Sequence, residues 1–263
     1  MKIHPTAIVG PSARLAEDVE IGAFACIGDL VEIGPRTLVE SHAIIEGLVR
    51  VGPDNSIGHG AIIGGAPQDL NFSEVTRSGI EIGRGNIIRE QVTIHRGTAT
   101  DSFTNIGDDN FFMAGAHVGH NCAIGNKVII ANNCLLGGYV TVEDGAFLGG
   151  GCGFHQFTRV GRLAIAQGNS GFAKDLPPFV IGAGLNKVVG LNVVGLKRAG
   201  FDPDDRAEIK AAFRLLYGSG LNVSQALEKA RTRSWREPAQ AFFDFVAAAK
   251  RRGICGLRRA WPV

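Results

Sequence analysis

The chain has 263 residues, which is enough for a large hydrophobic core or for two domains. Its 37 glycines and its hydrophobic content of 45% suit a fold with many tight turns around a buried interior. The net charge is only +2, but residues 195–263 hold 14 of the 27 lysines and arginines against 7 acidic residues. A basic segment on an acidic body indicates an anionic partner, although a solvated helical surface explains it equally well.

The N-terminal residues enter a repeat at once, so we expect no signal peptide. No apolar run is long enough to span a bilayer. The five cysteines lack the paired spacing of a disulfide framework or a metal site. We therefore expect a cytoplasmic protein without stable membrane insertion.

An apolar residue recurs at every sixth position through most of the first 166 residues. The first series is Ile3, Val9, Leu15, Ile21, Ile27, Ile33, Val39, Ile45, Val51, Ile57 and Ile63. The period returns at Ile82, Ile88 and Ile94, and then at Ile106, Phe112, Val118, Ile124, Ile130, Leu136, Val142, Leu148, Phe154, Val160 and Ala166. Such a fixed short period indicates a repeat architecture.

Each hexad also carries a small residue at its fifth position, such as Ala25 or Ala43, so it buries one large and one small side chain. Neither a helix nor a simple alternating strand has a period of six. Three short strands joined by tight turns do, and they form a triangular coil that stacks on the next at about 4.8 Å. The pattern resembles the hexapeptide-repeat left-handed parallel β-helix. The handedness comes from that resemblance, because the usual crossover rule predicts right-handed coils.

Three cysteines follow the same pattern. Cys122, Cys134 and Cys152 occupy the small fifth position of their hexads, so we expect buried thiols without a metal or redox role. Cys134 and Cys152 are one coil apart and should stack.

Two insertions interrupt the repeat, near residues 66–79 and 97–105. The first shifts the phase by one residue, whereas the second keeps it, because Ile94 and Ile106 are twelve residues apart. Loops that interrupt a solenoid commonly carry binding residues, although a tolerated surface insertion looks the same in the sequence.

The β-helix is expected to span residues 1–194, and Pro177 and Pro178 are expected to end regular strand pairing. Residues 195–263 then form an α-helical domain that covers the open end or the flank of the solenoid. Its first helix starts after a capping Asp202 and ends at Gly218. The second starts near Asn222 with a capping box, and the third runs from Pro238 to about Arg252, before Gly253.

Three histidines are candidates for chemistry. His117 and His120 are three residues apart, and His155 follows His120 by nearly two coils, which puts both on nearly the same face. His120 falls on a turn and faces outward. The chain has no Ser–His–Asp or Cys–His array, so the remaining catalytic role is that of a general base on a hydroxyl. A structural histidine stays open, as does a zinc site of the γ-class carbonic anhydrase type, although the spacing differs from that family.

Several motifs together resemble the UDP-N-acetylglucosamine O-acyltransferases of lipid A biosynthesis. These motifs lie at residues 68–70, 89–98, 117–120, 131–133, 155–157, 175–178 and 195–198. The resemblance covers the whole chain and implies a homotrimer with active sites in clefts between subunits. It implies transfer of a 3-hydroxyacyl group from acyl carrier protein to the 3-hydroxyl of UDP-N-acetylglucosamine, the first step of lipid A biosynthesis. No cofactor is implied beyond the phosphopantetheine of acyl carrier protein, and no nucleic acid partner.

The same resemblance assigns roles to individual residues. His120 is implied as the general base, and the Gly138 backbone N–H as the oxyanion donor, a type of group worth about 3 kcal/mol. The implied substrate-binding residues are Gln68, Asp69, Asn71, His117, Tyr139, His155, Gln156, Gly168, Asn192 and Arg198. Of these, His117, Gln68 and Asp69 would hold the glucosamine. His155, Asn192 and Arg198 would bind the nucleotide diphosphate, Gln156 would contact the substrates at the cleft, and Gly168 lies where the family measures acyl length.

This resemblance explains the positive charge of the C-terminal segment, because acyl carrier protein is strongly acidic and a basic surface would attract it. The candidate docking residues are Arg231, Arg233, Arg236, Arg251 and Arg252.

Five positions depart from the family pattern. Asn121 stands where an Asp normally follows the catalytic histidine, Asn71 where Lys is common and Tyr139 where His is common, while Val194 and Ala199 replace Glu and Arg. A neutral amide cannot stabilise an imidazolium as a carboxylate does. The acceptor therefore stays open between UDP-N-acetylglucosamine and a 3-amino or other UDP-sugar. The acyl length also stays open, and a zinc-dependent or non-catalytic solenoid is the third hypothesis.

Overall fold

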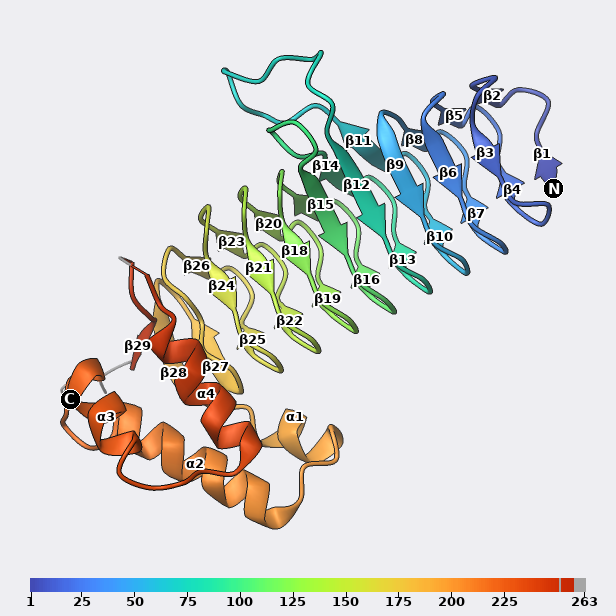
Figure 1. Cartoon of the computed structure of the whole chain (residues 1–263). Coiled ribbons are helices and arrows are strands. Elements are labelled where there is room, and N and C mark those ends of the chain that lie inside the picture. Colours follow the sequence, from blue (N-terminus) through green and yellow to red (C-terminus); the bar gives the residue numbers. More distant parts are fainter. Residues whose placement is uncertain (251, 258–263) are drawn as a thin grey trace.

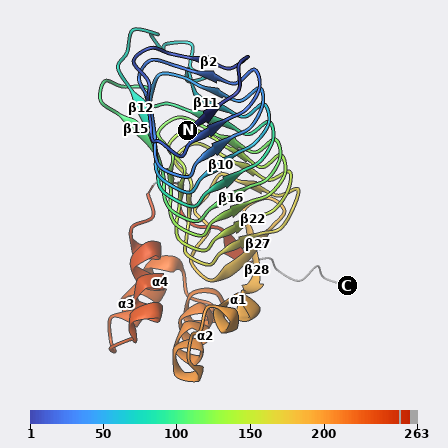
Figure 2. The ribbon, with the colours of Figure 1, turned by 90° about the vertical axis from the view of Figure 1, so that its right-hand side faces the viewer.

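The computed structural model describes residues 1–250 and 252–257 of the chain. They form a left-handed parallel β-helix followed by a group of helices at its C-terminal end, as the repeat and the capping signals predicted (Figure 1). Each coil gives one short strand to each of three sheets, named A, B and C below. Seen along the axis, the coils lie one behind another and the helices lie beside the stack (Figure 2).

From β1 to β26 the strands pass through sheets A, B and C in strict order, and β27, β28 and β29 then all join sheet A. Sheet A contains β1 (Lys2–Ile3), β4 (Glu20–Ile21), β7 (Leu38–Val39), β10 (Ser56–Ile57), β13 (Ile87–Ile88), β16 (Phe111–Phe112), β19 (Ile129–Ile130), β22 (Phe147–Leu148), β25 (Ile165–Ala166), β27 (Val180–Ala183), β28 (Lys187–Leu191) and β29 (Gly256–Leu257). Sheet B contains β2 (Ile8–Val9), β5 (Cys26–Ile27), β8 (Ile44–Ile45), β11 (Ile62–Gly65), β14 (Thr93–His95), β17 (His117–Val118), β20 (Leu135–Leu136), β23 (Gly153–Phe154) and β26 (Gly171–Phe172). Sheet C contains β3 (Arg14–Leu15), β6 (Val31–Ile33), β9 (Leu48–Val51), β12 (Gly79–Ile82), β15 (Phe103–Ile106), β18 (Ala123–Ile124), β21 (Thr141–Val142) and β24 (Arg159–Val160).

The strand register explains the phase of the sequence repeat. Paired residues of successive coils are 18 apart, as for Glu20 and Leu38. Ser56 pairs with Ile87 at a separation of 31, because a loop over residues 66–78 joins β11 to β12. Ile87 pairs with Phe111 at a separation of 24, because a second loop over 96–102 joins β14 to β15. The second loop is shorter than the predicted insertion, since β15 already begins at Phe103.

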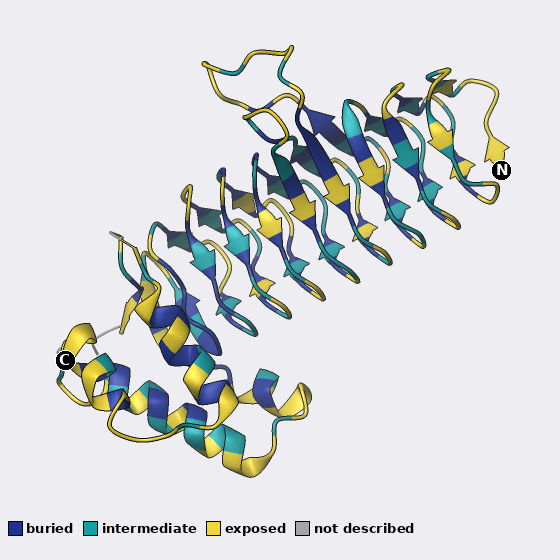
Figure 3. Cartoon of the chain, viewed as in Figure 1, coloured by how far each residue is buried: buried dark blue, intermediate teal, exposed yellow. Residues whose placement is uncertain are grey.

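The interior is filled by the two buried positions of each hexad (Figure 3). The large positions are buried from Ile21 to Ala166, whereas Ile3 in the first coil is 39% exposed. Cys122, Cys134 and Cys152 are fully buried, as their phase predicted. Burial raises the pKa of the Cys122 thiol to about 12, so this side chain acts as a small apolar group.

A ladder of asparagines replaces the small apolar residue in three successive coils. The Asn86 backbone N–H donates to Asn55 Oδ1 at 2.8 Å, and the Asn110 N–H donates to Asn86 Oδ1 at 3.0 Å. The Val128 N–H donates to Asn110 Oδ1 at 2.7 Å. All three side chains are buried, so the ladder pairs backbone donors that would otherwise lack an acceptor.

The prediction that Pro177 and Pro178 end the strand pairing is wrong. β27 pairs in parallel with β25 and antiparallel with β28, which extends sheet A beyond the prolines. Both prolines precede β27, where the ladder requires no N–H from them. The residues that close this end of the core are Phe172, Leu176, Phe179, Val180 and Val188, all of them buried.

Two of the helices have the predicted N-terminal caps. α2 (Pro203–Tyr217) is capped by Asp202, and α3 (Val223–Ala230) begins with the capping box of Asn222 and Gln225. α1 (Val193–Arg198) was not predicted, and it runs across the predicted domain boundary between residues 194 and 195.

The predicted extent of the third helix is wrong at its C-terminal end. α4 (Glu237–Ala247) does not continue to Arg252, because the chain turns back to the β-helix. There the Cys255 N–H donates to the Asp175 carbonyl at 2.8 Å, and β29 pairs with β28. A longer helix would lose these contacts.

The helical segment is attached to the flank of the last coils through two arginines. Arg159 on β24 donates from Nη2 to the Phe245 carbonyl at 2.9 Å, and its guanidinium lies 4.2 Å from the Phe245 ring centroid. Arg162 pairs with Glu237 at 3.1 Å. Both contacts reach α4, which therefore packs beside sheet C rather than over the open N-terminal end.

Candidate active site

The two loops and the His120 turn share one corner of the β-helix. In every coil this corner joins a strand of sheet B to a strand of sheet C. The loops over 66–78 and 96–102 occupy it in two successive coils, and His120 occupies it in the next coil, between β17 and β18. In Figure 1 both loops project from the same edge of the stack. The places where the sequence repeat fails and the predicted base therefore lie next to one another along one edge.

His120 lies on a turn, as predicted, but it does not face open solvent. Its side chain is only 8% exposed, and the Tyr139 ring packs edge-on against it at 5.2 Å between centroids. Its Nδ1 lies 3.0 Å from Asn121 Oδ1. The sequence predicted a turn residue outside the core, and His120 lies on that turn, where Thr98 of the loop over 96–102 bonds the neighbouring Asn121 at 3.0 Å.

Gly138 occupies the same corner one coil after His120, and its lack of a side chain is required there. A Cβ at this position would lie 2.8 Å from His120 Nδ1 and still closer to Cε1 and Nε2. The two residues predicted as base and oxyanion donor are thus in direct contact. Within the described residues, the Gly138 N–H donates no hydrogen bond to the chain itself.

His117 lies on the outer face of β17, one strand before the turn. The Thr93 hydroxyl lies 2.8 Å from its Nδ1, and the His95 ring packs against it at 5.0 Å between centroids. Burial lowers the pKa of His117 to about 4, with smaller contributions from His95 and His120. His117 is therefore neutral at pH 7 and can donate or accept a hydrogen bond without carrying charge.

The loop over 66–78 holds three predicted substrate-binding residues on its exposed surface, of which Gln68 and Asp69 were predicted to hold the sugar. Gln68, Asp69 and Asn71 are exposed, and the Asn71 N–H donates to Asp69 Oδ1 at 2.9 Å. The loop is tied to the neighbouring coil by Arg96, which lies 5.1 Å from the Phe72 ring centroid. These contacts keep the loop beside the coil that precedes His120.

On the C-terminal side of His120 the corner carries aromatic and polar side chains. Tyr139 stacks on Phe157 with centroids 4.8 Å apart. Gln156 is exposed, and His155 accepts a hydrogen bond on Nδ1 from Arg252. Tyr139, His155 and Gln156 therefore lie along the same corner as His120, and for His155 the spacing from His120 predicted this.

Three predicted residues lie elsewhere in the chain. Gly168 is on the corner between sheets A and B. Asn192 caps α1, where its Nδ2 donates to the Leu163 carbonyl and its Oδ1 accepts from the Gly195 N–H, each at 2.8 Å. Arg198 is exposed at the end of α1. One chain alone does not bring these three residues to the His120 corner.

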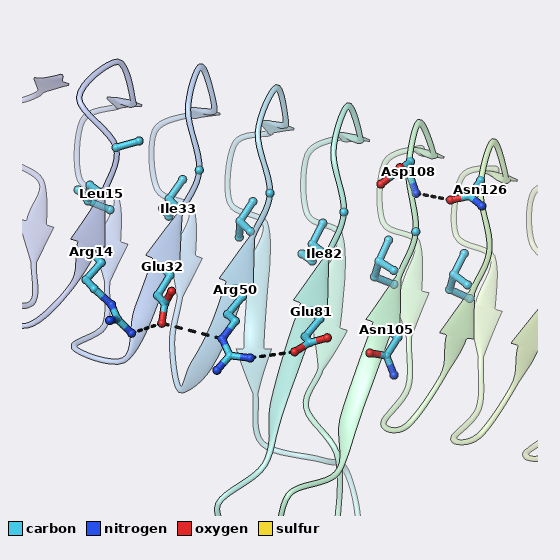
Figure 4. A pocket seen from close by; sticks show the side chains of 18 of the residues that line it. Arg14, Leu15, Glu32, Ile33, Arg50, Glu81, Ile82, Asn105, Asp108 and Asn126 are labelled. Atoms are coloured by element: carbon cyan, nitrogen blue, oxygen red, sulfur yellow. Dashed lines mark hydrogen bonds and ion pairs between the residues drawn. The ribbon is translucent and has the colours of Figure 1, made fainter.

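A groove of about 1160 Å³ runs along the outer face of sheet C, away from this corner (Figure 4). Its floor carries Arg14, Glu32, Arg50 and Glu81 from successive coils. Arg14 pairs with Glu32, and Arg50 pairs with Glu32 at 3.9 Å and with Glu81 at 3.0 Å. The four charges compensate one another, and Asp108, which also lines the groove, pairs with Arg84 at 3.7 Å, so the groove offers no unpaired charge to a ligand.

Comparison with known proteins identifies the family. A family model described as UDP-N-acetylglucosamine O-acyltransferase, domain 2, matches residues 175–255, and a bacterial transferase hexapeptide model (six repeats) matches 103–138. An acyl-(acyl-carrier-protein)–UDP-N-acetylglucosamine O-acyltransferase of Paraburkholderia xenovorans is 47% identical over 95% of this chain and 98% of its own length. The chain belongs to the UDP-N-acetylglucosamine O-acyltransferase family.

Solved structures of this family superpose on the whole chain. The UDP-N-acetylglucosamine acyltransferase from Campylobacter jejuni matches with a TM-score of 0.92 and 34% identity, over 98% of this chain and all of that one. The enzyme from Bacteroides fragilis matches with a TM-score of 0.90 and 39% identity, over 95% and 98%. The β-helix and the helical segment are therefore both features of the UDP-N-acetylglucosamine O-acyltransferase fold.

Two features of this family member were not found by sequence reasoning. Thr93 and Thr98 contact His117 and Asn121, yet neither threonine was singled out as a site residue. Both lie within the 89–98 stretch that resembles the family, and that resemblance was the signal that could have identified them.

Within the described residues, no group of three or more His, Cys, Asp or Glu side chains is placed to hold a metal ion. Over the same residues, no helix has the length and hydropathy needed to cross a membrane.

Proposed function

We propose that this chain transfers a 3-hydroxyacyl group from acyl carrier protein to the 3-hydroxyl of UDP-N-acetylglucosamine, the first step of lipid A biosynthesis. The observation that carries the proposal is the contact of His120 with Gly138 at a corner flanked by two loops, in a chain that is 47% identical to a curated acyltransferase along nearly its whole length. The test is mass spectrometry of the products formed from UDP-sugars and 3-hydroxyacyl carrier proteins of several chain lengths.

In the proposed mechanism His120 takes the proton of the sugar hydroxyl on Nε2. The oxygen then attacks the thioester carbonyl, and the Gly138 N–H stabilises the oxyanion of the tetrahedral intermediate. Collapse of the intermediate expels the phosphopantetheine thiolate, which His120 can protonate. The acyl group is already activated as a thioester, so no further cofactor is needed. We expect full activity after dialysis against a chelator. If removal of zinc by the chelator abolished activity, the zinc-dependent alternative would be favoured instead.

The sugar is proposed to lie against His117 and the loop carrying Gln68 and Asp69, because these residues and His120 share one corner. His117 is neutral and half-buried, which suits a hydrogen bond to an uncharged sugar group. Substitution of His120 by Ala should abolish transfer, with circular dichroism as the check that the variant is folded. Full activity of this variant would instead favour the non-catalytic solenoid.

The acceptor has a second candidate. Asn121 bonds His120 through a neutral amide, and an amine needs less help from a base than a hydroxyl does. A 3-amino analogue of UDP-N-acetylglucosamine would give an amide product. An assay that offers both nucleotides decides between them, and turnover of the amino sugar alone would exclude the hydroxyl acceptor.

We further propose that the active unit is a homotrimer with each site shared between subunits. Gly168, Asn192 and Arg198 lie away from the His120 corner of their own chain, so a neighbouring copy is needed to complete the site. Mixed trimers test this arrangement. A preparation that combines inactive His120→Ala chains with inactive Arg198→Ala chains should regain activity, whereas a site within one chain predicts no recovery.

The docking of acyl carrier protein is proposed on the basic helical segment. Two of the five predicted arginines are already engaged there. Arg236 pairs with Asp205 at 2.6 Å and Asp202 at 2.9 Å, and Arg233 pairs with Glu208 at 3.0 Å. Arg252 bonds His155, and Arg251 lies outside the described residues. Arg231, which is exposed on the C-terminal side of α3, is therefore the first candidate, and Arg231→Glu should raise the KM for acyl carrier protein.

We place the reaction in the cytoplasm. The five cysteines are all free thiols, including the buried Cys134 and Cys152, which are neighbours in successive coils. Free thiols are expected in a reducing compartment.

A further inference from the structure

The side-chain oxygen of Asn121 receives hydrogen bonds from three directions. The Thr98 backbone N–H donates to Asn121 Oδ1 at 3.0 Å, and the Thr98 hydroxyl donates to the same oxygen at 3.0 Å. His120 Nδ1 lies 3.0 Å from this oxygen as well. The loop over 96–102 thus contacts the predicted base through a single amide.

The backbone N–H of Thr98 decides which way the Asn121 amide points. An N–H can only donate, so the Asn121 atom that faces it must be the oxygen. The flipped amide would place its NH₂ group against the N–H, and no hydrogen bond would form. The orientation therefore follows from the contact with the loop and not from an arbitrary choice between oxygen and nitrogen.

The oxygen in turn decides the protonation of the neutral His120 ring. An amide oxygen only accepts, so His120 Nδ1 must carry the proton that it donates to Asn121 Oδ1. The other nitrogen, Nε2, then has a free lone pair. This is the atom that comes closest to the position of a Cβ on Gly138, together with Cε1. A base needs this lone pair on the side where the substrate hydroxyl arrives.

We propose that Asn121 is a positioning residue, held by Thr98, which keeps His120 in the tautomer that has its proton on Nδ1 and its lone pair on Nε2. This inference rests on the proposed role of His120 as the base. It assigns the loop over 96–102 a function in the reaction, because Thr98 locks the amide from outside the His120 coil.

Further contacts hold Asn121 and Thr98 in place. The Asn121 N–H donates to Thr104 Oγ1 at 2.8 Å, and this hydroxyl donates to the His95 carbonyl at 2.7 Å. The Tyr139 hydroxyl lies 3.0 Å from Thr98 Oγ1. Since that Oγ1 donates its own proton to Asn121, Tyr139 is the donor in this pair. The order of donation is Tyr139 to Thr98 to Asn121, with His120 donating to the same amide oxygen.

No charged side chain beside His120 selects its tautomer among the described residues. The titratable groups that face it are His95, His117 and Tyr139. Burial lowers the pKa of both His95 and His117, so both rings are neutral at pH 7. No carboxylate contacts His120 within the described residues, and hydrogen bonding rather than charge selects the tautomer.

The first experiment observes the tautomer directly and needs no activity. Full-length protein labelled with ¹⁵N-histidine is studied by long-range ¹H–¹⁵N correlation spectroscopy at pH 8, and the His120 signals are identified by their absence in His120→Gln. We expect the wild-type protein and Asn121→Asp to carry the proton on Nδ1, and Asn121→Ala to lose this preference. A wild-type ring with its proton on Nε2 would overturn the proposal.

The second experiment measures the consequence for turnover. General-base catalysis contributes about 10²–10⁴-fold, so Asn121→Ala should lower kcat by about 10- to 100-fold with KM nearly unchanged. Asn121→Asp keeps the acceptor and adds a charge. It should stay active, and the acid limb of its pH–rate profile should move to higher pH by about one unit. Thr98→Val should lower kcat by a smaller factor, and Thr98→Ser should restore it.

The control variant replaces an exposed residue with the same backbone conformation as Asn121, whose φ is 57°. A control away from every predicted site residue is Asp109→Ala, since Asp109 also has a left-handed backbone with φ of 56° and is exposed on the corner between sheets C and A. Asp109→Ala should leave both the His120 signals and kcat unchanged. A change of tautomer in Asn121→Ala without a fall in kcat would refute the positioning role. Absence of turnover in the wild-type protein would instead refute the proposed function and leave the spectroscopic result standing.

Discussion

The contact between Gly138 and His120 gives the sharpest prediction. In Gly138→Ala the new Cβ would lie 2.8 Å from His120 Nδ1 and closer to two other ring atoms, whereas carbon atoms prefer about 3.5 Å or more. The ring therefore has to move by about 1 Å. It is 8% exposed and packed against Tyr139, so the movement should cost about 1–3 kcal/mol of the free energy of unfolding.

The same displacement should lower kcat by about 100-fold, because a shift of about 1 Å in a reacting group has an effect of that size. The assay measures release of the free carrier-protein thiol, together with unfolding in urea. Gly190→Ala is the control, since a Cβ there meets no atom within 4 Å. Both variants keep their backbone N–H. If Gly138→Ala turned over within twofold of the wild-type rate, the assignment of this corner as the active site would fail.

The remaining predictions concern stability and reactivity. The pKa of His117 lies at about 4, so between pH 6.5 and 4 the unfolded chain binds a proton that the folded chain does not. The free energy of unfolding should therefore fall as the pH falls through this window, and less so in His117→Asn when both are measured by urea denaturation. Asn86→Ala leaves the buried Asn110 N–H without its acceptor and should cost about 2 kcal/mol or more, whereas the exposed Asn105→Ala should cost under about 0.5 kcal/mol. Iodoacetamide should modify the half-exposed Cys26 in the native protein and the buried Cys122 only after unfolding, as peptide mass spectrometry would show.

The sequence predicted the β-helix well because its information is periodic. A side chain six residues further on meets the same environment, so phase alone places Cys122 inside the core and His120 on a turn. Helix caps are equally local: Asp202 and Asn222 form the predicted hydrogen bonds with residues three positions later. Asn192, which caps α1 by the same contact with Gly195, carried this signal too and was interpreted only as a nucleotide contact.

Contacts between segments far apart in the sequence were not predictable in this way. The hydrogen bonds from Thr98 to Asn121 depend on the path of residues 96–102, and no period describes the path of a loop. α4 ends early because Cys255 bonds Asp175, a pairing across 80 positions that local helix signals do not contain. The role of Thr98 was hidden for the same reason, since it acts on Asn121 from the neighbouring coil.

The ion pairs on the outer face of sheet C depend on which coils are neighbours. The charge at this position alternates in sign from one coil to the next, through Arg14, Glu32, Arg50 and Glu81. Deleting a single coil, residues 32–49, would bring Arg14 beside Arg50 and oppose two like charges. Deleting two coils would bring Arg14 beside Glu81 and restore an opposite pair. With respect to these ion pairs, removal of two coils keeps an opposite pair at this position and removal of one does not, a constraint that the buried apolar positions do not impose.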